Sequence, residues 1–312
     1  GEGEATFVEL VLAVGAGRSP RIRGTMWLAD GALASGGAGE RRPLDDFPAT
    51  NLRHGRWNAL EITRGCVYAC AFCQTPFMFK ARFRHRSVDD VRRHVRAMAA
   101  GGLRYVRFVT PTALSYGAEG AAPELAAVEA LLAGVRAELG AAGKIYFGTF
   151  PSEVRPEHVT PEALAVIARW ADNRTLVIGG QSGSERVLAA THRGHGVDEI
   201  VRAVEIALAA GFRPDVDFLL GLPGETAEDR QASMRLATAL ADRGARIHSH
   251  AFMPLPGTPL AGAQPTAIEP AIGLAMERLE ARGAAYGQWR QQQLVAAELV
   301  RRRAGRTRLP RL

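Results

Sequence analysis

Three cysteines lie close together in the sequence and carry its clearest chemical signal. Cys66, Cys70 and Cys73 are spaced Cys-x3-Cys-x2-Cys, and they are the only cysteines among the 312 residues. Thiolates are soft ligands that favour iron–sulfur clusters and zinc. A four-iron cluster usually takes four cysteines, so three would leave one iron open to a small molecule. We therefore predict that these cysteines hold a [4Fe–4S] cluster.

Other kinds of cysteine site are less consistent with this spacing. A zinc site would need His54 or His85 as a fourth ligand, and structural zinc loops typically use paired Cys-x2-4-Cys knuckles. A redox pair of Cys70 and Cys73 would leave Cys66 unexplained. Inert buried thiols do not account for the clustering. A secreted disulfide framework would spread an even number of cysteines along the chain, so we expect a cytoplasmic protein.

The segments around the cysteines alternate between candidate strands and candidate helices. Ser87 and Thr226 suit helix N-caps, and Thr160-Pro161 opens another helix. Alternation of this kind predicts parallel strands covered by helices. The expected strands are 59–63, 104–109, 144–149, 175–178, 215–220 and 246–252; the expected helices are 87–100, 124–139, one opening at Thr160, 197–210 and 226–244.

The fold class that follows is α/β, a partial (β/α)6 TIM-like barrel with an irregular N-terminal lead-in and a C-terminal helical extension. We expect a lead-in or linker at residues 1–56, the barrel at 57–260, and a helical extension with a basic tail at 261–312. Within the extension we expect helices at 267–285 and 291–303. The sequence begins at Gly1 rather than at a Met, so a piece of a longer chain is one interpretation.

Working residues of a parallel αβ barrel lie just past the C-terminal ends of its strands. Here these positions are rich in glycine, proline and small polar residues, and the first of them leads into the cysteines. The remaining strand ends are Thr110-Pro111-Thr112, Phe150-Pro151-Ser152-Glu153, the run 179–184, the run 221–225 and the run 254–258. We expect all of them to share one mouth.

Three separated motifs resemble those of the radical S-adenosylmethionine superfamily, over about residues 57–259. The first is the cysteine loop Glu61-Ile-Thr-Arg-Gly-Cys-Val-Tyr-Ala-Cys-Ala-Phe-Cys73, with the aromatic Phe72 just before the third cysteine. The others are Gly180-Gln-Ser-Gly-Ser184 and Asp217-Phe-Leu-Leu-Gly-Leu-Pro-Gly-Glu-Thr226. They are similar to the cobalamin-binding and methylthiotransferase-like branch. The resemblance implies that the open iron chelates S-adenosylmethionine, which is reductively cleaved to methionine and a 5′-deoxyadenosyl radical.

The resemblance also implies roles for individual residues. Phe72 would lie by the adenine. Thr110 and Pro111 occupy the place that recognises the methionine amino group, where many relatives have Gly-Gly-Glu. The ribose or methionine would be bound by Glu153, Gln181, Ser182 and Ser184, the carboxylate by Arg193, and the adenine side would be shaped by Gly221 to Glu225.

Several of these residues have alternative interpretations. Ser182 and Ser184 could cap the next segment. Arg193 could be a solvent-exposed residue, and Glu153 could pair with Arg155. His248 and His250 alternate on one strand and would face the same side, where we favour a structural role over contact with a substrate.

Two reaction subclasses remain open, a cobalamin-dependent methyltransferase-type reaction and a methylthiotransferase-like modification of RNA or protein. Gly1-Glu2-Gly3-Glu4 resembles the end of a cobalamin-binding domain, yet the sequence holds no Asp-x-His-x-x-Gly cobalamin motif. It also shows neither the extra cysteine-bearing domain nor the β-rich RNA-binding module of methylthiotransferases, which ranks that subclass second. We expect a reductant such as flavodoxin or ferredoxin as a partner.

The charge is concentrated at the C-terminus. The formal net charge is +7, and removing the six arginines of residues 301–312 leaves +1 for the rest. A basic tail could contact nucleic acid, so a nucleic-acid-binding protein with a structural metal is an alternative of another class. The nearly neutral body argues against it, and we favour a solvated, frayed terminus. No signal peptide is visible, and no apolar stretch is long enough to cross a bilayer.

Overall fold

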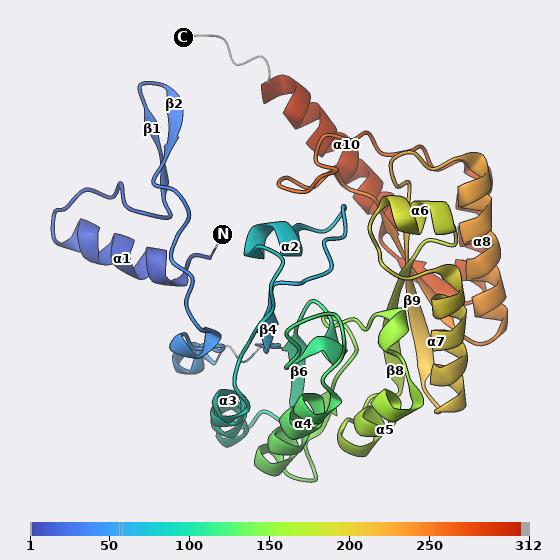
Figure 1. The fold of residues 1–312 in the computed structure, drawn as a ribbon, viewed down its shortest axis with the longest axis horizontal. Coiled ribbons are helices and arrows are strands. Elements are labelled where there is room, and N and C mark those ends of the chain that lie inside the picture. The colour runs from blue at the N-terminus through green and yellow to red at the C-terminus, as the bar shows by residue number, and fades with distance from the viewer. Residues whose placement is uncertain (1, 56, 58, 307–312) are drawn as a thin grey trace.

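A computed structural model describes residues 2–55, 57 and 59–306 and shows a curved parallel sheet covered by helices (Figure 1). One part of the sheet has the order β3-β6-β7 and the other the order β11-β10-β9-β8, with every pairing parallel. The stretch after β7 joins the two parts through a parallel bridge between Val154 and Ile178. The strands are β3 (Leu60–Glu61), β6 (Tyr105–Val109), β7 (Lys144–Tyr146), β8 (Thr175–Gln181), β9 (Arg213–Leu220), β10 (Arg246–Ala251) and β11 (Ala285–Gly287).

Helices follow the strands as the alternating pattern predicted. They are α3 (Val88–Ala100), α4 (Leu125–Leu139), α5 (Pro161–Trp170), α6 (Glu185–Ala190), α7 (Val197–Ala209), α8 (Ala227–Asp242), α9 (Pro270–Ala281) and α10 (Trp289–Arg306). Three predicted caps are confirmed, because the hydroxyls of Ser87, Thr160 and Thr226 each accept a backbone N–H from the first turn of α3, α5 and α8.

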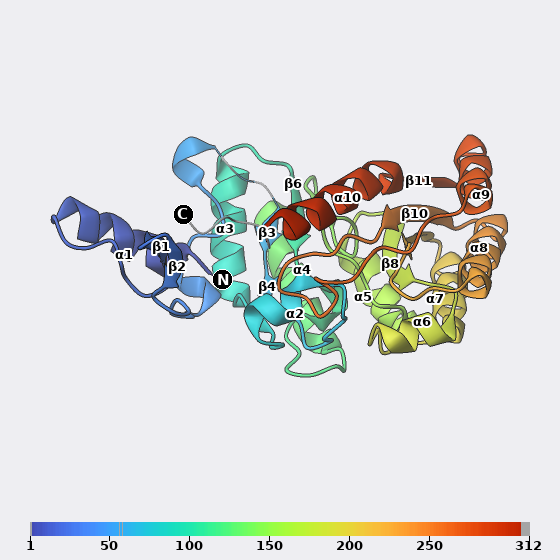
Figure 2. The same cartoon turned by 90° about the horizontal axis from the view of Figure 1, so that it is seen from above.

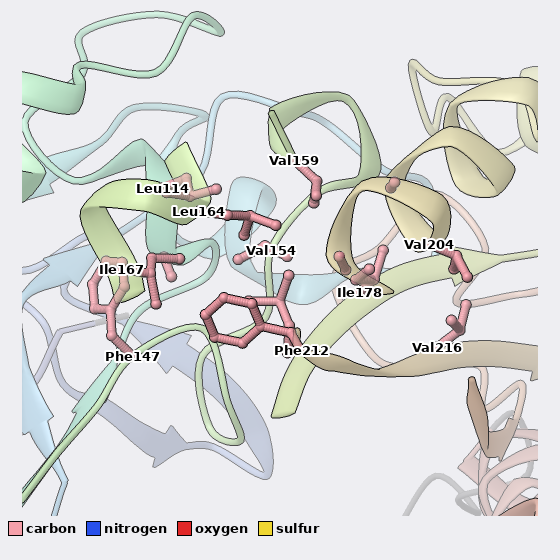
Figure 3. Packing of buried hydrophobic residues seen from close by; sticks show 14 of the residues in the cluster. Leu114, Phe147, Val154, Val159, Leu164, Ile167, Ile178, Val204, Phe212 and Val216 are labelled. Atoms are coloured by element: carbon pink, nitrogen blue, oxygen red, sulfur yellow. The ribbon is translucent and has the colours of Figure 1, made fainter. Parts of the chain in front are cut away.

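The hydrophobic core lies between the sheet and these helices. Phe147, Val154 and Ile178 from the sheet side meet Leu164 and Ile167 of α5, and all five are buried (Figure 3). Strand β6 alternates, so that Val106 and Phe108 are buried in the core while Tyr105 and Val109 on the other face are exposed and Arg107 is half-buried.

The structure departs from the predicted elements at the first strand and in the extension. The first predicted strand is split into β3 and β4 (Thr63–Arg64), and β4 pairs antiparallel with β5 (Arg84–His85). The extension is not purely helical, because β11 interrupts it and adds a seventh strand to the barrel sheet. Its short stretch Ala285–Gly287 gave no strand signal beside the long helical patterns on either side.

The lead-in has more structure than the irregular segment we expected. It forms helix α1 (Glu4–Gly15) and a hairpin of β1 (Met26–Ala29) and β2 (Ala32–Ser35), which project to one side of the barrel (Figures 1 and 2). Glu2 ties this part to the barrel through ion pairs with Arg64 and Arg84. At the other end, Arg301–Arg303 belong to α10, whereas the last arginines, Arg308 and Arg311, lie outside the described residues. Among the described residues, we find no helix with the length and apolar character that crossing a membrane requires.

Candidate active site

The cysteine loop connects β4 to the short helix α2 (Gln74–Phe79) at the mouth of the barrel (Figure 2). It starts at Gly65, whose φ of 85° is unfavourable for other residues and where a side chain would collide with the backbone oxygen of Arg82. Further along, Ala71 N–H donates to Thr191 O at 2.9 Å and Cys73 N–H to Cys70 O at 3.0 Å. These contacts fix the loop against the neighbouring elements.

All three cysteines are free thiols that line one cavity of about 520 Å³. Cys70 is buried, and Cys66 and Cys73 are partly buried. Burial is the main cause that raises the pKa of the Cys66 thiol to about 11, and the neighbouring thiols Cys70 and Cys73 contribute to this rise. Burial likewise raises the pKa of Cys73. Three soft donors that meet in one cavity fit an iron–sulfur cluster with one open iron.

Two buried guanidinium groups lie behind the thiols. Arg193 places Nη1 at 3.6 Å from Cys70 Sγ, and it donates to Gly179 O at 2.6 Å and to His195 Nε2 at 3.0 Å. Arg155 donates to the backbone oxygen of Arg193 and stacks over the Tyr68 ring, with Cζ 3.6 Å from the centroid. The alternative of a solvent-exposed Arg193 is therefore wrong. Its polar atoms face Cys70 and the end of β8.

The end of β8 brings three predicted residues together. A register shift between Ile178 and Gln181 marks a bulge in β8, and Gln181 has a φ of 74°. The side chains of Arg193, Gln181 and Glu153 converge over Gly179, where an added Cβ would lie within 3.2 Å of all three. A side chain at position 179 would displace these polar groups, so glycine allows them to meet.

The carboxyl groups of Glu153 and Asp217 also line the cavity. Burial raises the pKa of Glu153 to about 8, with Asp217 as a further cause, and burial raises the pKa of Asp217 to about 7. Glu153 does not pair with Arg155, which instead binds Glu157 at 2.5 Å, so that alternative is wrong. A carboxyl of raised pKa can hold a proton at neutral pH and donate it to a polar ligand.

The remaining predicted residues divide between the cavity and its surroundings. Phe72, Thr110, Pro111, Glu153, Gln181 and Arg193 all line the cavity. Phe72 also packs against Val187, Leu222 and Phe252, which holds its ring in place. The Thr110 hydroxyl is turned to Thr112 O at 3.0 Å.

Ser182, Ser184, Gly221 and Glu225 lie beside the cavity rather than in its wall. Ser184 caps α6, as one alternative predicted, and its hydroxyl donates to Asp229 Oδ1 at 2.5 Å. Ser182 instead meets the Ser233 hydroxyl at 3.1 Å, and Glu225 accepts from Gly221 N–H at 3.1 Å.

Asp217, His250 and Gln292 also line the cavity, although we assigned them no role in binding the cofactors. Asp217 could have been noticed as a charged residue directly before the apolar run Phe218-Leu219-Leu220 on β9. For His250, strand alternation was the one signal, because it places this residue on the same face as His248. Gln292 belongs to α10 and reaches the cavity only through the packing of that helix against β10.

Residues 60–237 match the family model described as the radical SAM superfamily. Among curated relatives, a tRNA-2-methylthio-N(6)-dimethylallyladenosine synthase of Verminephrobacter eiseniae is 31% identical over 72% of this chain and 48% of its own length. An enzyme of the same description from Geobacter sulfurreducens is 29% identical over 76% of this chain and 52% of its own length. The chain thus spans about half the length of the curated relatives it matches.

Two solved structures share the fold. The radical S-adenosylmethionine methyltransferase TsrM from Kitasatospora setae, solved with cobalamin and a [4Fe–4S] cluster, superposes with a TM-score of 0.64 at 19% identity, covering 84% of this chain and 54% of that one. The cobalamin-dependent S-adenosylmethionine radical enzyme OxsB superposes with a TM-score of 0.60 at 17% identity, covering 76% of this chain and 35% of that one.

Proposed function

Because this chain belongs to the radical S-adenosylmethionine superfamily, we propose that Cys66, Cys70 and Cys73 hold a [4Fe–4S] cluster at which S-adenosylmethionine is reductively cleaved. The observation that carries the proposal is that the three cysteines of the chain line one cavity. When bound, the cluster would supply the electron that splits S-adenosylmethionine into methionine and a 5′-deoxyadenosyl radical.

The residues of the chain bind and orient the two cofactors. The thiolates ligate iron, and the Arg193 guanidinium beside Cys70 offsets their negative charge. Phe72 offers an apolar ring for the adenine, and Gln181 and Glu153 offer polar atoms for the ribose or the methionine part. A cavity of about 520 Å³ lies in the size range of small-molecule cofactor sites.

The roles of the remaining site residues are also part of this proposal. Thr110 and Pro111 would border the methionine amino group, with the Pro111 ring closing one side of the cavity. Arg193 would reach the carboxylate only by giving up one of its contacts to Gly179, His195 or Cys70. Ser182, Ser184, Gly221 and Glu225 would act by shaping the loops around the cofactor.

Anaerobic reconstitution tests the proposal. We expect about four irons and four sulfides per chain, and release of 5′-deoxyadenosine after reduction in the presence of S-adenosylmethionine. Cys70→Ala should lose both properties, whereas Ala69→Ser, an exposed neighbour in the same loop, should keep them. Continued production of 5′-deoxyadenosine by a folded Cys70→Ala protein would refute the proposal.

For the reaction itself we propose a cobalamin-dependent methyl transfer to a substrate of unknown class. The support is the fold shared with TsrM and OxsB. The sequence has no Asp-x-His-x-x-Gly motif, so the corrin would be bound by residues other than these 312. Equilibrium dialysis of reconstituted protein with hydroxocobalamin should show no tight binding by this chain alone. Methyl transfer should then require a separately supplied cobalamin-binding domain.

A methylthiotransferase-like reaction is the second candidate, because relatives at about 30% identity are described as tRNA-modifying enzymes. It predicts RNA binding, for which the arginines of residues 301–312 would be the source of charge. Salt-dependent tRNA binding that is lost on deleting these residues would favour this candidate. We propose flavodoxin or ferredoxin as the reductant for either reaction.

We also propose that the chain is organised as a lead-in at residues 1–56, a barrel at 57–260 and an extension at 261–312.

A further inference from the structure

A second set of potential metal ligands faces the same cavity from β9 and β10. Asp217 on β9 and His248 on β10 are directly paired in the sheet register, and His250 follows two residues later on the same face. Asp217 and His250 line the cavity that also contains the three cysteines. One carboxylate oxygen and two imidazole nitrogens come together here, and none of them is needed to hold the iron–sulfur cluster.

The three atoms are spaced as the ligands of one ion. Asp217 Oδ1 lies 2.8 Å from His248 Nδ1 and 3.9 Å from His250 Nε2, and the two nitrogens are 3.2 Å apart. An ion placed at the centre of the triangle that these three atoms form would lie about 2.0 Å from each of them, which is the length of a zinc–nitrogen bond. A triangle of this size matches one face of a tetrahedron with bonds of about 2.1 Å. The face of an octahedron with the same bonds would be smaller.

The hydrogen bonds around Asp217, His248 and His250 require a positive ion between Asp217 and His248. Gln292 Oε1 accepts from Ala251 N–H at 2.8 Å, so its Nε2 donates to His250 Nδ1 at 3.2 Å. His250 then carries its proton on Nε2, directed at His248 Nδ1, which becomes an acceptor. The close contact between that nitrogen and Asp217 Oδ1 therefore needs a cation between them, either a proton or a metal ion.

The surroundings hold the ligands in position. His248 stacks on Tyr286 with ring centroids 4.4 Å apart and planes 8° apart, and the Tyr286 hydroxyl donates to Asp215 at 3.2 Å. Burial lowers the pKa of both His248 and His250, which keeps the imidazoles neutral and able to ligate. With an ion bound, His250 Nδ1 would carry the proton. A half-turn of the Gln292 amide would then present its oxygen to that proton, and the hydrogen bond to Ala251 N–H would be lost.

We propose that Asp217, His248 and His250 form a zinc site whose fourth position is open to the cavity. Two nitrogens and one oxygen suit Zn²⁺, and three protein ligands with one open position are typical of catalytic rather than structural zinc. The open position would take a Lewis-basic oxygen or nitrogen of the substrate, or a water molecule. The site is independent of the cysteines, so it stands whether or not the cluster proposal is correct.

The test uses all 312 residues with Cys66, Cys70 and Cys73 replaced by alanine, which removes thiolate binding of the probe. Co²⁺ should give the intense visible absorption of tetrahedral coordination, and Zn²⁺ should displace it at one ion per chain. Adding His250→Gln or His248→Gln should weaken Zn²⁺ binding about 100-fold or more. His54→Gln, an exposed histidine outside the site, should leave binding unchanged.

Circular dichroism shows which variants are folded, and thermal unfolding gives a second measure of binding. Zn²⁺ should raise the unfolding midpoint of the cysteine-free chain but not that of the chain that also lacks His250. Equal Zn²⁺ affinity with and without the two histidines would overturn the proposal, as would no binding to the folded cysteine-free chain. A proton between Asp217 and His248 would then be the cation.

Discussion

The contact between Arg193 and Cys70 makes a quantitative prediction about the cluster. Arg193 is buried, with 8% of its surface exposed, and its Nη1 lies 3.6 Å from Cys70 Sγ. A fixed positive charge next to a ligating sulfur stabilises the reduced cluster, which carries one more electron, and so raises the reduction potential. Arg193→Leu removes this charge and leaves a shorter, apolar side chain, which also gives up the hydrogen bonds to Gly179 and His195.

Coulomb's law gives the size of the effect. Two unit charges 3.6 Å apart interact by about 5 kcal/mol at an effective dielectric constant of about 20. For one electron, about 1.4 kcal/mol corresponds to about 59 mV, so the upper limit is about 200 mV. The added electron is shared over the whole cluster rather than held on one sulfur. We therefore expect the potential to fall by about 100 mV.

A redox titration followed by electron paramagnetic resonance measures this change on reconstituted protein. Arg193→Lys keeps the charge and should keep most of the potential. Arg202→Leu on the exposed face of α7 changes the net charge equally and should leave the potential unchanged. A shift of less than about 30 mV in an Arg193→Leu protein with full iron content would refute the reasoning, since screening would then outweigh the contact.

Three further predictions concern the scaffold. Gly65→Ala should lower the iron retained after reconstitution, because the added methyl group meets the Arg82 backbone oxygen at a φ of 85°; iron analysis against Ala69→Ser is the measurement. Arg86→Met should lower the free energy of unfolding by about 3 kcal/mol, because the buried Asp90 carboxylate loses its buried partner at 2.6 Å and retains the largely exposed Arg93, while the backbone oxygens of Phe47 and Glu61 lose their donor; urea titration checks this, and a change below about 1 kcal/mol would contradict it. Hydrogen bonding to Arg186 is the main cause that lowers the pKa of Asp229. The ionised Asp229 carboxylate therefore contributes its full stabilisation above about pH 4, and this contribution is lost as the pH falls. Thermal unfolding of the natural protein between pH 5 and pH 3 should therefore depend on pH more steeply than that of Asp229→Asn.

Local signals in the sequence predicted the order of the elements well. The caps at Ser87, Thr160 and Thr226 depend on residues within one helical turn of each other, so the structure confirms them directly. The cysteine site could be predicted for the same reason, because Cys66, Cys70 and Cys73 lie within one short loop. Strand β11 was missed because three residues between two helical patterns carry almost no periodic signal.

The arrangement of the site residues depended on contacts between distant segments. Ser184 and Arg193 lie only nine positions apart, yet one caps a helix beside the cavity and the other reaches Cys70 across 123 positions. Residue type did not distinguish them, because hydroxyl and guanidinium groups serve both as structural and as binding groups.

The sequence by itself determined that three thiols would share one site at the end of the first strand, because neighbours along a short loop cannot separate. Only the tertiary structure decided which charges face them. The fold brings Glu153, Arg193 and Asp217 to the same cavity from three separate segments of the chain, and the pairing of β9 with β10 sets Asp217 beside His248. Such distances follow from strand register and packing across the barrel, which no local pattern encodes.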